Sequence, residues 1–405
     1  MNFLRVRKVI LSVLSAVLLF VSGYSLGVYG IDLDSLTRGK INRSLPANRL
    51  NVNFDLFWKV WDTLESNYYD KSKLVVGDMI YGAISGMVGA VGDPYTSFLT
   101  PDQNKIVEED LSGSFEGVGI QIGFKGKNLA VIAPLPDSPA EKAGIKAGDF
   151  IIGIKDDTKG VDTVTTGINI NDAVKLIRGK AGTKVTLFLT RDGISETLIK
   201  EVTRQALDVP SVVLDFVGQD ENIAHIKLLK FGADTKKEWE KAVEKINDKK
   251  PNAKLILDLR NNPGGYLQGA VDIAGYFVKK DSVIVIEDRS GQKTEFKTDI
   301  SPKLDKYKLV ILVNEGSASA SEILAGALSE IKGIKLIGEK TFGKGTIQEP
   351  LQLEKGAGLH ITTAKWLTPK GNWVHEAGLK PDIEIKDNEE TTEDEQLQEA
   401  IRQVI

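Results

Sequence analysis

The sequence predicts an α/β core, a mixed sheet with packed helices, preceded by a strand-rich block and a small N-terminal helical module. The segments 254–265 and 308–317 each begin with a buried apolar strand, and helical patterns separate them. This alternation is typical of parallel strand pairs. Residues 107–205 instead show short strands between glycine turns, and residues 53–106 place apolar side chains at helical spacing.

The composition limits the classes of protein to consider. The chain has 405 residues, 41% of them hydrophobic and 27% charged, which suits two or three globular domains. A net charge of −4 argues against nucleic acid as a partner. The chain has no cysteine, so disulfides, thiolate metal sites and a cysteine nucleophile are excluded. No cluster of histidines and carboxylates suggests a metal, and we expect neither a metal nor a cofactor.

The first 31 residues read as a membrane helix. Three basic residues near the start precede an uncharged run over 9–31, which is about long enough to span a bilayer. The basic side chains would stay in the cytoplasm, so the rest of the chain would lie outside it. A cleaved signal peptide, giving a secreted form, is the alternative, although no clear A-x-A site follows. Residues 32–52 are polar and aperiodic, and we interpret them as a linker.

The predicted helical module covers residues 53–106. An aromatic stripe over 54–64 and a small-residue segment over 78–91 are its two helices, and the motif GDPYTSFLTP follows them. We interpret the stripe as packing, with a dimer contact as the alternative.

The block 107–205 resembles a PDZ domain in the order of its elements and in two motifs, FEGVGIQIGF and SPAEKAGIKAGD. In such a domain, the N–H groups of Val118, Gly119 and Ile120 converge on the carboxylate of a peptide C-terminus. Gly117 and Gly119 let the backbone approach closely. A following helix offers the other wall of the groove, through Ala173, Val174 and Ile177.

The stretch NEGSASASEILAG, residues 314–326, sets three serines before a helical pattern. Ser319 and Glu322 have the spacing of a capping box, which would make Ser319 a structural residue. The same strand–turn–helix arrangement also suits an exposed nucleophile. The Ala320 N–H would then lack a helical partner and could stabilise an oxyanion.

A second stretch, GEKTFGKGTIQEP, nearly matches a phosphate-binding loop, but Gly345 occupies the position of the required Ser or Thr and a strand pattern follows. In an extended segment Lys344 and Gln348 share one face. Desolvation could leave the Lys344 amine neutral, and a neutral amine can activate a serine. The rival base is a histidine of a Ser-His-Asp arrangement, and the chain offers three candidates: His225, His360 and His375.

Several motifs in order resemble the carboxyl-terminal processing (tail-specific) proteases, from about residue 54 to the C-terminus. They are GDPYTSFLTP, the PDZ block, LDLRNNPGG, NEGSASASEILAGAL, GEKTFGKGTIQ and TPKGNWVHEAGLKPDI. The resemblance implies a dyad of Ser319 as nucleophile and Lys344 as base, assisted by Gln348. It implies an oxyanion hole of the Ala320 and Gly265 N–H groups, with Gly264 as the alternative glycine, and a homodimer.

We therefore predict a membrane-anchored serine endopeptidase outside the cytoplasm that acts on proteins with free apolar C-termini. Residues 206–386 would form its protease core and residues 387–405 an acidic segment with a short helix. A catalytically silent scaffold that binds C-terminal tails is the alternative from another class. A Ser-His hydrolase of small esters is the third.

Overall fold

The computed structural model describes residues 53–126, 128–135, 137–168, 170–191, 193–251, 253–386 and 393–405. The predicted membrane helix (1–31) and linker (32–52) lie outside them. Among the described residues, no helix is both long enough and apolar enough to cross a membrane. The chain divides into two units, Met1–Val76 and Gly77–Ile405. The predicted helical module, 53–106, therefore contributes to both.

The described part of the first unit consists of α2 (Asp55–Asn67) and a 3-10 turn, η3 (Lys71–Lys73). Three aromatic side chains of α2 contact one another: the ring centroids of Phe57 and Trp58 lie 4.9 Å apart, and those of Trp58 and Trp61 lie 6.1 Å apart. Trp61 is buried, whereas Leu56 is exposed. The aromatic side chains of the stripe thus contact one another along the helix, whereas Phe54 and Leu64 of the same stripe are exposed.

The second unit begins with α3 (Val76–Gly89), β1 (Ser97–Leu99) and α4 (Pro101–Ser112). Thr100 caps α4, and its N–H donates to the Gln103 side chain at 3.0 Å. Phe98 of β1 contacts Tyr81 of α3, with 5.8 Å between their ring centroids. The predicted boundary at residues 106 and 107 falls inside α4.

The PDZ block folds as a six-stranded sheet with two helices. A separate strand pair closes it, β2 (Ser114–Gly117) with β9 (Gln205–Asp208). The sheet and its helices are β3 (Ile120–Lys125), β4 (Asn128–Pro134), β5 (Phe150–Asp156), β6 (Val161–Val164), β7 (Lys184–Arg191), β8 (Ile194–Thr203), α5 (Pro139–Lys142) and α6 (Ile170–Ile177). A buried ion pair, Arg204 with Asp156 at 2.6 Å, joins the end of β8 to β5.

The protease core is built on a mixed sheet of six strands. Only the first pair is antiparallel, and the other neighbours run parallel. In sheet order the strands are β10 (Val212–Val217), β11 (Ile223–Leu228), β12 (Lys254–Asp258), β15 (Leu309–Val313), β16 (Leu336–Gly338) and β19 (Ile383–Glu384). The predicted α/β core with parallel pairs is confirmed.

Side chains of the central strands are buried on both faces. One face, including Leu257 and Ile311, packs on three helices, α7 (Thr235–Lys249), α8 (Leu267–Gly275) and α9 (Ala320–Lys332). The other face, including Ile256 and Leu312, packs on α10 (Glu395–Val404). Burial on both faces explains the continuous apolar runs in the sequence.

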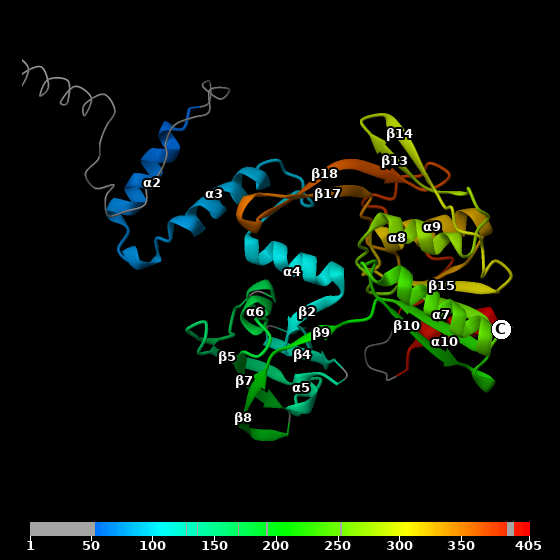
Figure 1. The fold of residues 1–405 in the computed structure, drawn as a ribbon, viewed down its shortest axis with the longest axis horizontal. Helices are drawn as coiled ribbons and strands as arrows, with labels where there is room; N and C mark the ends of the chain where they lie inside the picture. The colour runs from blue at the N-terminus through cyan, green and yellow to red at the C-terminus, as the bar shows by residue number, and fades with distance from the viewer. Residues whose placement is uncertain are drawn as a thin grey trace, which may run out of the picture. The chain divides into compact units, whose positions relative to one another are not determined.

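A second sheet, which is antiparallel, covers α8 and α9 from the far side (Figure 1). Its strands are β1, β13 (Val283–Arg289), β14 (Gln292–Lys297), β17 (Thr346–Gln352) and β18 (Gly358–Leu367). Two 3-10 turns complete the core, η4 (Gln219–Glu221) and η5 (Glu354–Gly356). Strand β17 follows Lys344 directly, as the alternating pattern predicted, and no phosphate-binding helix begins there.

Candidate active site

Ser319 lies at the turn between β15 and α9 in an unusual backbone conformation, with φ 54° and ψ −115°. A serine that only caps a helix has an extended backbone, and a positive φ is strained for any residue but glycine. The capping-box pairing with Glu322 is present, but the hydrogen bond that measures 2.9 Å runs from the Ser319 N–H to the carboxylate. The hydrogen bond with this length therefore uses the backbone of Ser319 and not its hydroxyl.

The neighbouring serines are buried and engaged. The Ser317 hydroxyl donates to the Leu259 carbonyl at 2.8 Å, and the Ser321 hydroxyl donates to the Asn262 carbonyl at 2.9 Å. Both acceptors belong to the segment around the end of β12. Ser317 and Ser321 thus fasten one loop to another, and Ser319 is the half-buried serine of the three.

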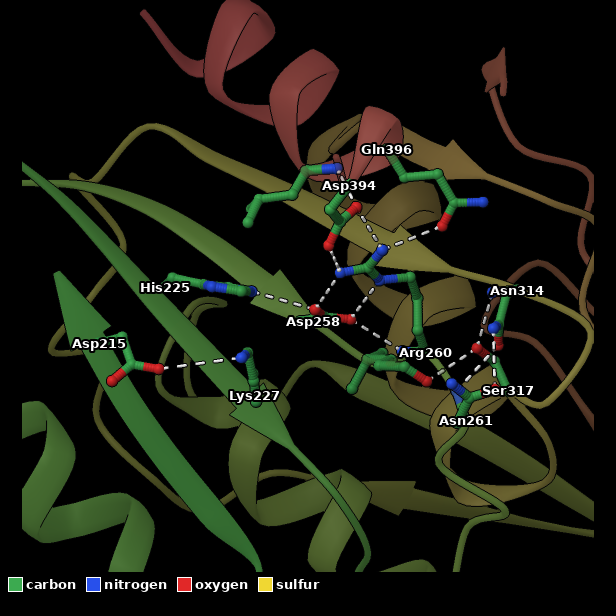
Figure 2. A network of polar contacts seen from close by, with 12 residues as sticks. Asp215, His225, Lys227, Asp258, Arg260, Asn261, Asn314, Ser317, Asp394 and Gln396 are labelled. Carbon is green, nitrogen blue, oxygen red and sulfur yellow. Dashed lines mark hydrogen bonds and ion pairs between the residues drawn. The ribbon is translucent and has the colours of Figure 1, made fainter. Parts of the chain in front are cut away.

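A pair of asparagines strengthens this connection between the two loops. The Asn261 N–H donates to the Asn314 side chain at 2.8 Å, and the Asn314 amide donates back to Asn261 at 2.9 Å. Figure 2 shows this pair beside Ser317. The loop after β12 therefore has a fixed position against the Ser319 turn.

That loop contains the two glycines considered for the oxyanion hole. A β-carbon on Gly264 would come within 2.9 Å of Ser319 Cβ and 3.0 Å of the Ala320 nitrogen. Only glycine can pack so closely against the turn. The Gly264 N–H already donates to the Asn262 side chain at 2.9 Å. Of the two glycine N–H groups, that of Gly264 is therefore already engaged within its own loop.

Lys344 lies in the loop before β17, and its side chain is half-buried. Burial lowers the pKa of Lys344, against the opposing charges of Asp93 and Glu322. Its Nζ lies 5.3 Å from the centre of the Tyr95 ring. The Trp366 indole donates to the Lys344 carbonyl at 2.8 Å and holds its backbone. Desolvation of this lysine is what the glycine-rich context predicted.

Gln348 does not contact Lys344 through a hydrogen bond in the described part of the chain. Its amide donates to the hydroxyls of Thr346, at 2.9 Å, and Thr362, at 3.2 Å. Nor do the described residues include a hydrogen bond between Ser319 and Lys344. Catalytic hydrogen bonds are often long or misaligned before substrate binds.

Glu322 has a larger part in the site than its capping-box spacing indicated. Its buried carboxylate accepts four hydrogen bonds: from the N–H groups of Ser319 (2.9 Å), Gly343 (2.7 Å) and Lys344 (2.9 Å), and from the Thr341 hydroxyl (2.6 Å). One carboxylate thus holds both the serine turn and the lysine loop. The helix spacing was visible in the sequence, but the contacts with residues 341–344 depend on the fold.

Two of the three histidines are engaged in other contacts. His225 is buried, with its Nε2 at 3.0 Å from Asp258, whose carboxylate also binds Arg260 (Figure 2). His375 stacks on the Trp373 ring with 4.9 Å between centroids. Among the described residues, no imidazole forms a hydrogen bond with a serine hydroxyl. The buried His225–Asp258 pair was not recognised in the sequence, because it joins two separate strands.

Arg260 extends the network of Figure 2 to the C-terminal helix. Its guanidinium donates to both carboxylate oxygens of Asp394, each at 2.8 Å, and to Gln396 at 3.2 Å. Burial alone would raise the pKa of Asp258, but hydrogen bonds from His225 and Arg260 outweigh it and lower that pKa to about 2. The loop of the oxyanion candidates therefore continues from a strand end that ion pairs fix in place.

The PDZ groove lies between β3 and α6. Its lining includes five residues at the expected positions: Val118, Gly119, Ile120, Val174 and Ile177. A β-carbon on Gly119 would come within 2.4 Å of Ser138 Cβ, so the close approach predicted there is real.

Two residues that were expected to line the groove, Ala173 and Gly117, do not line it, whereas Arg178 does. Ala173, expected in the wall, is instead fully buried in the PDZ core, because it faces the sheet and not the groove. Gly117 is absent from the lining and packs against the Phe115 ring. Arg178 lines the groove and donates to Asp110 of α4 at 2.6 Å.

A half-buried serine on a strained strand–helix turn, a desolvated lysine and a PDZ groove together define a PDZ-containing serine peptidase. Comparison with known proteins identifies the family. Residues 222–385 match the model of peptidase family S41, and residues 131–191 match that of the PDZ domain.

Two relatives from Bacillus subtilis (strain 168) are similar over most of their length. Carboxy-terminal processing protease CtpA is 38% identical over 341 residues, 84% of this chain and 70% of the relative. CtpB is 32% identical over 368 residues, 90% of this chain and 75% of the relative. A solved structure, the photosystem II D1 C-terminal processing protease, has 29% identity and a TM-score of 0.54 over 89% of this chain and 98% of its own. The chain belongs to the carboxy-terminal processing proteases of peptidase family S41.

Proposed function

We propose that the chain is an endopeptidase with a Ser319–Lys344 dyad, assisted by Gln348, that binds C-terminal tails of its substrates in the PDZ groove. The observation that carries the dyad is the shared carboxylate of Glu322. It accepts the N–H groups of both Ser319 and Lys344, at 2.9 Å each, so the two residues are held by one anchor.

In this mechanism the Ser319 hydroxyl attacks the scissile carbonyl while its proton passes to the neutral Lys344 amine. The N–H groups of Ala320 and Gly265 stabilise the oxyanion. The C–N bond then breaks, and the protonated lysine returns the proton to the leaving amine. Water hydrolyses the acyl-enzyme by the same route. Gln348 would turn from Thr346 and Thr362 toward the lysine when substrate binds.

Cleavage of an unfolded reporter protein with an apolar C-terminus tests the dyad. We expect the parent to cut, and Ser319→Ala and Lys344→Ala to bind the reporter without cutting it. Turnover by Ser319→Ala would show that the wrong serine was chosen. A parent that binds but never cuts would favour the silent scaffold instead.

The tail-binding part of the proposal rests on the groove between β3 and α6. A carboxylate would accept hydrogen bonds from the N–H groups of the 118–120 turn, and the last side chain would contact Val174 and Ile177. A reporter with an amidated C-terminus should therefore bind at least tenfold more weakly than the free acid, since a charge-assisted hydrogen bond is lost. Equal affinities would remove the PDZ groove from the proposal.

We further propose that residues 1–31 anchor the chain in the membrane with the protease outside the cytoplasm, because basic residues precede an uncharged run. Alkaline carbonate extraction of cell membranes would leave an anchored chain in the pellet, whereas a cleaved chain would appear in solution with a lower mass. The homodimer that the family resemblance implies is tested by sedimentation of the purified chain.

A further inference from the structure

The GDPYT motif, residues 92–96, has no part in the function proposed so far. It forms a tight turn between α3 and β1. The Asp93 carboxylate accepts the Tyr95 N–H at 3.1 Å and the Thr96 hydroxyl at 2.6 Å. The Thr362 N–H donates to Thr96 at 3.0 Å, and β1 pairs with β18. Strand β18 therefore holds this turn beside β17, the strand that follows Lys344.

Tyr95 places its ring against the Lys344 side chain. The Lys344 Nζ lies 5.3 Å from the ring centre, a distance at which an aromatic face attracts an ammonium group. Another neighbour of the Tyr95 ring is His375, with ring centroids 6.0 Å apart, and His375 stacks on Trp373. The Trp373 indole donates to the Gly345 carbonyl at 2.8 Å. The tyrosine ring is thus supported by the lysine loop itself.

Asp93 adds a charge to the same surroundings. Its negative charge favours the protonated form of Lys344, and so does that of Glu322, whereas burial favours the neutral form. The backbone of Lys344 is fixed by hydrogen bonds to Glu322 and from Trp366. The direction of the Lys344 side chain therefore depends on the groups that surround its amine.

We propose that the 92–96 turn is part of the active site and that Asp93 and Tyr95 are positioning residues for Lys344. The proposal rests on the proposed Ser–Lys function. Tyr95 confines the lysine side chain, and Asp93 keeps its pKa from falling further. The turn begins three residues after α3 ends, so the segment ahead of the PDZ block completes the catalytic site.

The charged and titratable groups that face Lys344 are Asp93 and Tyr95 from the turn, Glu322 from α9 and His360 from β18. Asp93→Asn removes the charge and keeps an acceptor for the Tyr95 N–H, although an NH₂ group replaces the oxygen that accepts the Thr96 hydroxyl. The pKa of Lys344 should fall, so the rising limb of kcat/KM against pH should move to lower pH. The full-length chain is assayed with a quenched peptide, and Asp78→Asn, at an exposed site on α3, is the matched control.

Two substitutions of Tyr95 test whether its aromatic ring is needed. Tyr95→Leu should lower kcat about tenfold and change KM less than twofold, because the ring contact with Lys344 is lost. Tyr95→Phe keeps the ring and should stay within twofold of the parent. Thermal melting of each variant accompanies the kinetics. If Tyr95→Leu does not fold, the role of the turn is tested by the pH dependence of kcat/KM in Asp93→Asn alone.

The outcomes separate this inference from the proposed function. Lys344→Ala is included, and if it retains activity, the Ser–Lys dyad is wrong and this inference falls with it. If Lys344→Ala is inactive but Asp93→Asn leaves the limb unmoved, only the role of the turn is wrong. A loss in Tyr95→Phe equal to that in Tyr95→Leu would also contradict it, because the ring would not be the acting group.

Discussion

At the scale of single residues, the carboxylate of Glu322 is the strictest requirement of the site. All four of its partners donate, including Thr341, whose hydroxyl oxygen also accepts the Leu379 N–H. An amide at this position would set an NH₂ group against N–H donors, so glutamine is a poor substitute.

We predict that Glu322→Gln lowers kcat/KM about 100-fold, since the NH₂ group takes the place of an oxygen that accepts two hydrogen bonds, either those of Thr341 and Gly343 or those of Ser319 and Lys344. Peptide-cleavage kinetics measure this. The control is Glu315→Gln, the same exchange at an exposed position of the same turn. Full activity of Glu322→Gln would show that the carboxylate only fills space.

The sequence could suggest candidates for the reacting residues but not their surroundings. Ser319 and Lys344 became candidates because each lies in a short motif, and the order of these motifs can be read from the sequence without knowledge of the fold. The partners of Lys344 were not recognised because Tyr95 reaches it through the pairing of β1 with β18, which joins residues over 250 positions apart. The partners of Gln348 were not recognised either: its amide donates to two threonine hydroxyls, those of Thr346 and Thr362.

At the scale of elements, the site depends on two loops that hold each other. The loop after β12 contains the glycines proposed for the oxyanion hole, and the turn after β15 contains Ser319. Ser321 connects them, with its hydroxyl 2.9 Å from the Asn262 carbonyl. The acceptor of Ser321 lies 59 positions away in the sequence, and the parallel pairing of β12 and β15 brings it close.

Ser321→Ala should therefore lower kcat about tenfold and leave KM nearly unchanged, because a hydrogen bond of about 1 kcal/mol is lost and the oxyanion donors shift. Steady-state kinetics separate the two constants. Ser329→Ala, farther along α9, is the matched control. A rise in KM alone would mean that this loop connection serves substrate binding and not the oxyanion.

At the scale of the whole molecule, the network around Asp258 ties the central sheet to the C-terminal helix. Strand β11 contributes His225, strand β12 contributes Asp258, and Arg260 reaches Asp394 at the start of α10. The fold class and the PDZ domain were predictable from periodicity and motifs. This network was not, because its members are far apart in the chain and each looks ordinary alone.

The lowered pKa of Asp258 predicts how stability responds to acid. A carboxyl whose pKa falls to about 2 on folding stabilises the protein above pH 4, and this contribution is lost as pH falls through 2. The loss amounts to about 2 kcal/mol. The difference in free energy of unfolding between the parent and Asp258→Asn should thus shrink from pH 4 to pH 2 in urea titrations. Asp248→Asn, on the surface of α7, should follow the parent, and a constant difference for Asp258→Asn would contradict the prediction.

The central claim is that a lysine, and not a histidine, takes the proton of Ser319. The measurement that tests it most directly is kcat/KM for peptide cleavage as a function of pH, in the parent and in variants of His225, His360 and His375. Burial lowers the pKa of Lys344 from 10.5, so kcat/KM should rise with pH as the amine loses its proton. This rise should have its midpoint below pH 10.5 and should be present in all three histidine variants. A profile that is flat between about pH 6 and 9, or a limb near pH 6.5 that one histidine variant abolishes, would contradict the account.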